Sequence, residues 1–153
     1  MSAEARITTL GLQLPEPVPP AFQYLAVVVH AGTAWVSGQI PRAGSQVMMT
    51  GKVGAEISLE QARSAARACV LQGLAQIKQT LGSLERVERL LKVTGFVASA
   101  PGFQQQPQVL DAASELLVEI FGEAGRHARS AIGVAELPRG VPVEIELVVA
   151  VRE

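Results

Sequence analysis

One arginine stands apart near the end of the chain, in the run "HARSAIGVAELPRGVPVEIELVVAV" over residues 127–151. Arg129 opens a stretch that otherwise contains small and branched apolar side chains. If this stretch is a strand, its alternation places Ala131, Gly133 and Ala135 on the same face as the guanidinium. Small neighbours leave space in front of a planar fork that suits a carboxylate. Two interpretations remain open: an exchangeable carboxylate ligand, or a structural ion pair with an acidic side chain across an interface.

Two glutamates follow in the last apolar run of the chain. Glu144 and Glu146 share one face of the expected strand, opposite Val143, Ile145 and Leu147. One interpretation is a catalytic carboxylate, since glutamate is a common general acid or base. The alternative is a solvated strand face, on which alternating glutamates are common.

The remaining polar residues give weaker signals. Ser37 has no histidine near it in the sequence, so we expect it to serve in the turn that Gly38 permits. His30 and His127 are the only histidines and are far apart. This is no metal-ligand spacing, and the glycine clusters lack a phosphate-loop pattern. We therefore expect no metal site.

The most secure element that could position these residues is a helix. From residue 58 apolar side chains recur at helical spacing, Ser58 and Gln61 have the spacing of a capping box, and Gly82 supplies a stop. The expected buried face consists of Leu59, Ala62, Ala66, Cys69, Val70, Leu74, Ile77 and Leu81.

The other elements follow from β-branched runs and turn residues. A second helix should begin near Pro107 and end at Gly122. Four prolines within residues 15–20 predict that residues 1–21 form an extended lead-in. The remaining expectations are a hairpin of 22–30 and 33–39, a loop with one short strand over 41–56, and strands at 87–99, 128–137 and 142–151. The order β-β-α-β-α-β-β predicts one α+β domain over residues 1–153, with two helices on one face of a mixed sheet.

Composition limits the class of protein. The chain has 153 residues, of which 48% are hydrophobic, and a formal net charge of −1. The sequence has no basic stripe of the kind that binds nucleic acid, so we expect no nucleic-acid partner. It also has no apolar run long enough to cross a bilayer. Cys69 is the only cysteine and falls in a helical pattern, so we expect a buried thiol and a cytoplasmic protein.

The apolar pattern also predicts self-association. The runs "YLAVVV" and "ELVVAV" are apolar at consecutive positions, so they present hydrophobic side chains on both faces of their strands. Two helices cover only one face, and a symmetric copy of the chain would cover the other. We expect an oligomer interface that includes Val27, Val29 and Val148 or their immediate neighbours.

Four segments resemble the successive signatures of the Rid (YjgF) family, also called the endoribonuclease L-PSP family: "WVSGQIP", "VERLLKVTGFVAS", "HARSAIGVAELPRG" and "VPVEIELVVAV". The resemblance runs from about Tyr24 to the C-terminus. It implies a chorismate-mutase-like fold and a homotrimer with ligand clefts between subunits. It also implies hydrolysis of 2-aminoacrylate and related enamines or imines to 2-oxo acids and ammonia, without a metal or an organic cofactor. The extended 42–55 loop and "EIFGEAGRHARSA" suggest a longer branch of the family.

The resemblance also implies roles for single residues. Arg129 matches the carboxylate-binding arginine, and Glu144 matches a glutamate that handles water. The strand-end Ser-Gly-Gln of the family falls on Ser37, Gly38 and Gln39, and its N-terminal tyrosine falls on Tyr24.

Several positions depart from the family pattern. Ala131 stands where many active members have a cysteine, and His127 stands where they have proline. Tyr24 follows "AFQ" where relatives have Gly-Pro before the tyrosine. The cleft asparagine has no clear counterpart, and Ser114 is nearest by position.

Two functions remain as hypotheses. In the first, an enamine/imine deaminase, Arg129 holds the substrate carboxylate, backbone groups near Gly38 and Ala131 orient the substrate, and Glu144 positions water. In the second, a non-catalytic trimer binds small carboxylate metabolites. An endoribonuclease is a weaker third option, because the sequence shows neither a basic groove nor a paired histidine.

Overall fold

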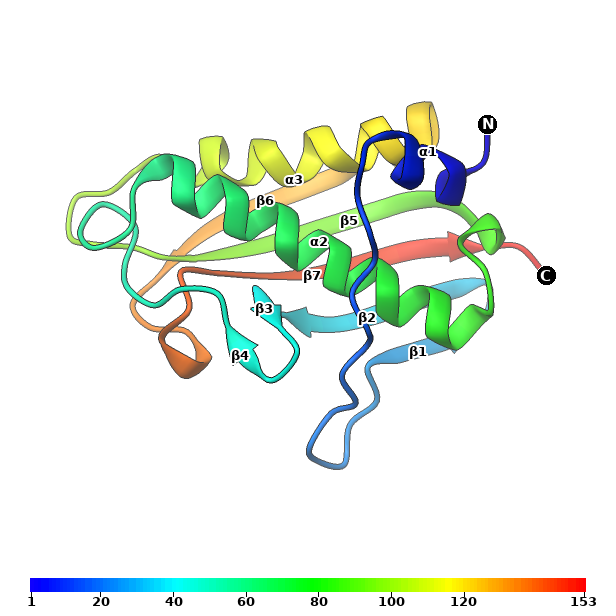
Figure 1. Cartoon of the computed structure of the whole chain (residues 1–153), viewed down its shortest axis with the longest axis horizontal. Helices are drawn as coiled ribbons and strands as arrows, with labels where there is room; N and C mark the ends of the chain where they lie inside the picture. The colour runs from blue at the N-terminus through cyan, green and yellow to red at the C-terminus, as the bar shows by residue number, and fades with distance from the viewer.

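A computed structural model describes residues 1–153 and shows a mixed five-stranded sheet with two long helices packed on one face (Figure 1). The strands are β1 (Val27–His30), β2 (Thr33–Gln39), β5 (Val87–Ala98), β6 (Ala128–Val134) and β7 (Val143–Val151), and the long helices are α2 (Leu59–Leu81) and α3 (Gln106–Phe121). The strand order is β1-β2-β7-β5-β6. Only β5 and β6 pair in parallel, and the other neighbours are antiparallel. The predicted α+β class and the two-helix layer are confirmed.

Helix α2 begins and ends where the sequence predicts. The Ser58 side chain accepts a hydrogen bond from the Gln61 amide and the Gln61 side chain returns one to Ser58, which forms the capping box. Gly82 ends the helix in the left-handed conformation, with φ of 86°. Cys69 is buried on the sheet-facing side, and burial raises the pKa of its thiol well above the ordinary value.

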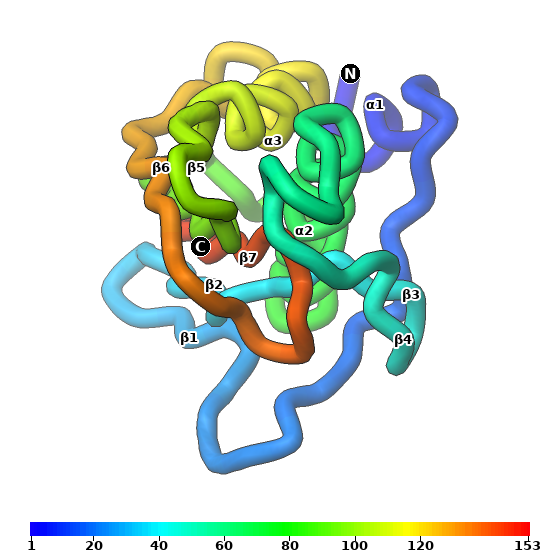
Figure 2. Tube along the Cα trace, turned by 90° about the vertical axis from the view of Figure 1, so that its left-hand side faces the viewer, coloured from blue at the N-terminus to red at the C-terminus, as the bar shows by residue number.

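The helices divide the sheet between them. Helix α2 packs over β2 and β7, whereas α3 packs over β5 and β6 (Figure 2). Alternation along β7 sends Val143, Ile145, Leu147, Val149 and Val151 into this layer, and all five are buried. None of the helices combines the length with the apolar character that spanning a lipid bilayer requires.

The other face of the sheet carries no layer of its own. Trp35 is 56% exposed and Val28 is 46% exposed there, although both lie on strands. The sequence pattern predicts an oligomer interface that includes Val27, Val29 and Val148 or their immediate neighbours. Of these, Val27 itself is 6% exposed and belongs to the core under α2, whereas its neighbour Val28 is exposed. An apolar run of six residues does not reveal which member faces inward, and here the register places Val28 outward.

The expectation of an extended lead-in over residues 1–21 is wrong for its first part, because Ala3–Thr9 form helix α1. The Ser2 side chain caps this helix, and Ile7 is buried in the core. Lys78 Nζ lies 2.9 Å from Glu4 Oε2, and the Leu84 amide donates to Glu4 Oε1. The helix is therefore fixed by distant partners, and its local sequence gives little sign of them.

The loop over residues 41–56 contains two short strands, where one was expected. Strands β3 (Arg42–Ala43) and β4 (Gln46–Val47) form a small hairpin. Further along, Val53 is fully buried and its amide donates to the Ala98 carbonyl at the end of β5. The loop is thus part of the packed molecule.

Candidate functional site

Arg129 lies on β6, the edge strand beside β5. Its register partner is Val93, which is fully buried beneath the helices, so the guanidinium faces the helical layer. Ala131 pairs with Gly95 on the same face, as the alternation predicted. The arginine therefore projects at the seam between the sheet edge and α3.

Four polar side chains meet at this seam, and we call Asp111, Ser114, His127 and Arg129 the arginine cluster. Arg129 Nη1 donates to Asp111 Oδ1 at 2.9 Å and to Ser114 Oγ at 3.1 Å. Its Nε and Nη2 atoms make no hydrogen bond within the chain. Half of the guanidinium fork is thus fixed by α3, and the other half is free to bind a ligand.

His127 orients the serine of this cluster. Its Nδ1 lies 2.7 Å from the Gly125 carbonyl, which only accepts, so Nδ1 carries the proton. Nε2 is then an acceptor, and the Ser114 hydroxyl donates to it across 2.9 Å. Burial lowers the pKa of His127, and the neighbouring Arg129 lowers it further, so the ring is neutral at neutral pH. Ser114 consequently keeps its lone pairs directed at Arg129.

A second group surrounds the end of β2, and we call Tyr24, Ser37, Gly38 and Glu144 the glutamate cluster. The register between β2 and β7 shifts between Val36 and Gln39, which forms a bulge. A Cβ atom at Gly38 would lie 2.8 Å from Glu144 Oε2, so only glycine lets the carboxylate approach this backbone. The bulge therefore brings backbone polar groups and a carboxylate together.

Glu144 is half-buried on the open face of β7. Burial raises the pKa of its carboxyl group, and the charge of Glu146 on the same face raises it further. A carboxylate in this state holds a proton more readily than an ordinary glutamate. That property suits a group that takes a proton from water and returns it.

Tyr24 and Ser37 complete this cluster. The strand predicted to start at residue 22 begins only at Val27, so Tyr24 lies in the preceding loop and is 56% exposed. Ser37 Oγ donates to the Leu25 carbonyl at 2.7 Å and thereby ties the loop to β2. Tyr24, Gly38 and Gln39 line one cavity.

The two clusters do not meet within one chain. Arg129 faces the helical layer beside Val93, whereas Glu144 pairs with Phe96 on the open face. They also belong to strands separated by β5 in the sheet. The structure therefore places the predicted site residues in two separate clusters.

Comparisons with known proteins identify the fold. A family model described as "YjgF/chorismate mutase-like, putative endoribonuclease" matches residues 4–143. Protein TCP17 of Trypanosoma cruzi is 42% identical over 146 residues, which cover 95% of this chain and 91% of that protein. This chain belongs to the YjgF family.

Solved structures agree with that membership. A protein of unknown function from Agrobacterium tumefaciens is 38% identical, with a TM-score of 0.91 and coverage of 98% of this chain and 92% of that one. A "putative endoribonuclease" from Shewanella oneidensis is 30% identical, with a TM-score of 0.95 and coverage of 99% of this chain and 100% of that one. The YjgF-like architecture thus spans the whole chain.

Sequence reasoning on this YjgF-family chain missed Asp111, the ion-pair partner of Arg129. The open alternative of a structural ion pair placed the acid across an interface, but Asp111 belongs to the same chain. Asp111 and Ser114 stand three residues apart on α3, among buried apolar positions. That polar pair on one side of an apolar helix was the available signal.

Proposed function

We propose that this YjgF-family protein is a homotrimer that binds small carboxylates in clefts between subunits. In these clefts it hydrolyses reactive enamines or imines, of the 2-aminoacrylate type, to 2-oxo acids and ammonia. The observation that carries the proposal is the free half of the Arg129 fork, because Nε and Nη2 offer two parallel donors beside small residues. Asp111 and Ser114 hold the other half in place.

The separation of the arginine cluster from the glutamate cluster supports a cleft made by two chains. The arginine cluster lies at the β6 edge, and the glutamate cluster lies toward the opposite edge of the sheet. A cyclic assembly brings one edge of a subunit against a different surface of the next. Arg129 of one subunit would then face Glu144 of its neighbour.

The reaction gives a role to each of the two clusters. Arg129 binds the carboxylate and draws electron density from the imine carbon. An enamine first takes a proton at its terminal carbon and becomes the protonated imine. Ionised Glu144 accepts a proton as water attacks the imine carbon, and a neutral carbinolamine forms. The same carboxyl group returns that proton to nitrogen and then accepts the hydroxyl proton as the carbon–nitrogen bond breaks, so the products are ammonia and the 2-oxo acid. Backbone groups at Gly38 and Ala131 orient the substrate.

Mixing two inactive variants tests the shared cleft. Arg129→Ala and Glu144→Gln should each abolish ammonia release from an enamine generated by a second enzyme. If the variants are unfolded and refolded together in equal amounts, about a quarter of the clefts should combine an intact arginine with an intact glutamate. Recovery near that fraction supports the proposal, and no recovery shows that the site does not span two chains.

A non-catalytic carboxylate-binding trimer is the alternative outcome. It would show 2-oxo acid binding by calorimetry that depends on Arg129, but no ammonia release from the wild-type protein.

A further inference from the structure

Gly38, which lies against Glu144, also lines a cavity of about 340 Å³ of which Glu144 is not a lining residue. Tyr24 and Gln76 contribute to its walls, together with the guanidinium-bearing residues Arg42 and Arg139. No aspartate or glutamate is among its lining residues. Neither arginine forms an ion pair. We call it the basic cavity.

The extended loop and the turn before β7 bring these arginines together. Arg42 begins β3, and its Nε donates to the Gly44 carbonyl at 3.0 Å. Arg139 lies in the 3-10 turn Pro138–Gly140, and its Nη2 donates to the Ser45 carbonyl at 2.7 Å. Both side chains are anchored through one nitrogen, and their other donors are free for a ligand.

The backbone at Arg139 also supports a ligand-binding role. Its φ is 58°, a left-handed conformation that is uncommon for residues other than glycine. Such strain persists where the surroundings hold it, and it is concentrated at functional sites. The Gly51 amide donates to the Gly140 carbonyl at 2.9 Å, so the loop fixes this turn directly.

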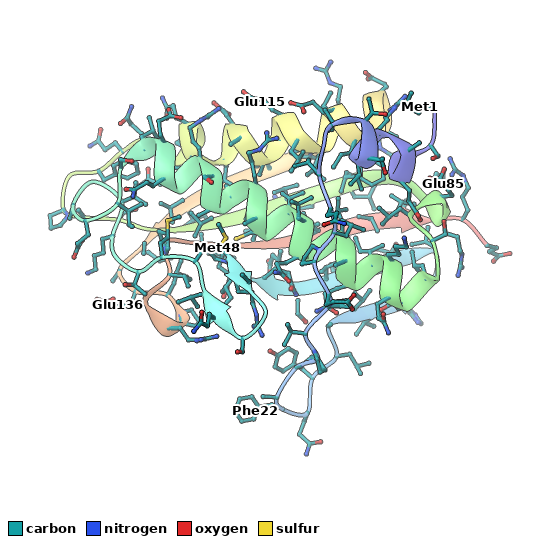
Figure 3. The ribbon with its side chains drawn as sticks, in the orientation of Figure 1. Met1, Phe22, Met48, Glu85, Glu115 and Glu136 are labelled. Carbon is teal, nitrogen blue, oxygen red and sulfur yellow. The ribbon has the colours of Figure 1, made fainter.

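Apolar residues also line the basic cavity. Residues 19–22 supply prolines and Phe22, and Phe22 is 82% exposed at the tip of a projecting loop (Figure 3). The lining thus combines two guanidinium groups with apolar side chains. An acid with a short carbon chain and a terminal anionic group matches this arrangement.

We propose that the basic cavity binds a second anionic group of the substrate, a carboxylate or a phosphonate, at the end distant from the reacting carbon. The preferred substrates are then dianionic 2-imino acids and the products dianionic 2-oxo acids. This inference rests on the proposed function, since it extends the same cleft beyond Gly38. Arg129 of the neighbouring subunit holds the carboxylate next to the reacting carbon, and Arg42 and Arg139 select the far end.

Calorimetry with matched ligands tests this selection. The wild-type protein should bind 2-oxoglutarate more tightly than 2-oxopentanoate, which has the same number of carbons and no terminal charge. The double variant Arg42→Gln/Arg139→Gln should lose about tenfold or more in affinity for 2-oxoglutarate and change little toward 2-oxopentanoate. A comparison of 3-phosphonopyruvate with oxaloacetate, its carboxylate counterpart, shows whether the cavity prefers a terminal phosphonate or a terminal carboxylate.

Two further variants control for a general loss of positive charge and for misfolding at Arg139. Arg152→Gln also removes a charge from an arginine that donates to backbone carbonyls, but at the C-terminal end of the molecule, and it should leave the ligand preference unchanged (Figure 1). Arg139→Gly removes the charge and suits the left-handed backbone, so it replaces Arg139→Gln if that variant does not fold.

The outcomes separate this inference from the proposed function. Equal wild-type affinity for the charged and uncharged ligands, or an unchanged preference in the double variant, overturns the inference and leaves the carboxylate site standing. If no 2-oxo acid binds, the proposed function fails. An NMR titration with succinate then tests whether the basic cavity binds an anion by itself. Chemical-shift changes at the Gly38 and Gln39 amides that vanish in the double variant support the basic cavity, and the absence of such changes overturns it.

Discussion

At the scale of residues, Arg129 differs from an ordinary structural arginine in how few of its donors the chain uses. One nitrogen holds both Asp111 and Ser114, and the small residue Ala131 lies on the same face of β6 as the guanidinium. Asp111 is itself 48% exposed, so the pair is partly screened by water. The ion pair therefore fixes the direction of the guanidinium without consuming its capacity to bind an anion.

Replacement of Arg129 by lysine separates charge from geometry. Arg129→Lys keeps the positive charge but loses the bidentate fork, so binding of small 2-oxo acids should weaken by about 1–3 kcal/mol in calorimetry. The thermal unfolding midpoint should change little. A variant that unfolds while the wild type binds no 2-oxo acid would identify Arg129 as a purely structural partner of Asp111.

The second residue-scale prediction concerns pH. Burial and the charge of Glu146 raise the pKa of Glu144, and hydrolysis needs the ionised form. The acidic limb of the kcat/KM profile should therefore lie above the ordinary glutamate range, with activity rising as pH rises through the raised pKa. Glu146→Gln removes the charge that contributes to the raised pKa of Glu144, so it should move the acidic limb of the profile to lower pH. Glu119→Gln, at an exposed position on α3, should leave the acidic limb where it is. An acidic limb that stays at the same pH in Glu146→Gln would contradict the assignment of this limb to Glu144.

At the scale of elements, the sequence predicted the long helices and most strands because each carries its own periodicity. The capping box of α2 and the alternation of β7 are local signals. Helix α1 was missed because its seven residues are stabilised by partners near residues 78–85 and 120. The Arg129–Asp111 pair was missed for a related reason: only the packing of α3 against β6 brings the two together.

The contact between α3 and β5 supplies an element-scale prediction. A Cβ atom at Gly95 would collide with the Leu110 side chain, which is fully buried. Gly95→Ala should therefore lower the free energy of unfolding by about 1–3 kcal/mol through overpacking. Exposed Glu88→Ala on the same strand should change it by less than about 0.5 kcal/mol. Urea denaturation measures both, and a neutral Gly95→Ala would show that α3 moves away freely.

At the scale of the whole molecule, the uncovered face of the sheet exposes apolar side chains to solvent. Trp35 and its register partner Val148 lie there beside Val28. We expect threefold self-association to bury this face, with light scattering giving a trimer mass. A stable dimer would contradict that expectation.

The single tryptophan makes the assembly measurable. Trp35 should emit as a buried indole in the oligomer and shift to longer wavelength on dissociation. Trp35→Asp places a charge on the face and should yield monomers, whereas Leu10→Asp, at an exposed site beyond α1, should leave the mass unchanged. Monomeric Trp35→Asp with full activity would show that the cleft does not need a second chain.

The attachment of α1 has a consequence for the order in which the chain folds during synthesis. The Ala3 amide donates to Glu85, Glu4 accepts from Leu84, and Arg6 reaches the Ile120 carbonyl. Every one of these partners is translated long after the helix itself leaves the ribosome, because synthesis proceeds from the N-terminus. The first helix to be made must therefore wait for α3, and its docking is a late event that reports completion of the core beneath it.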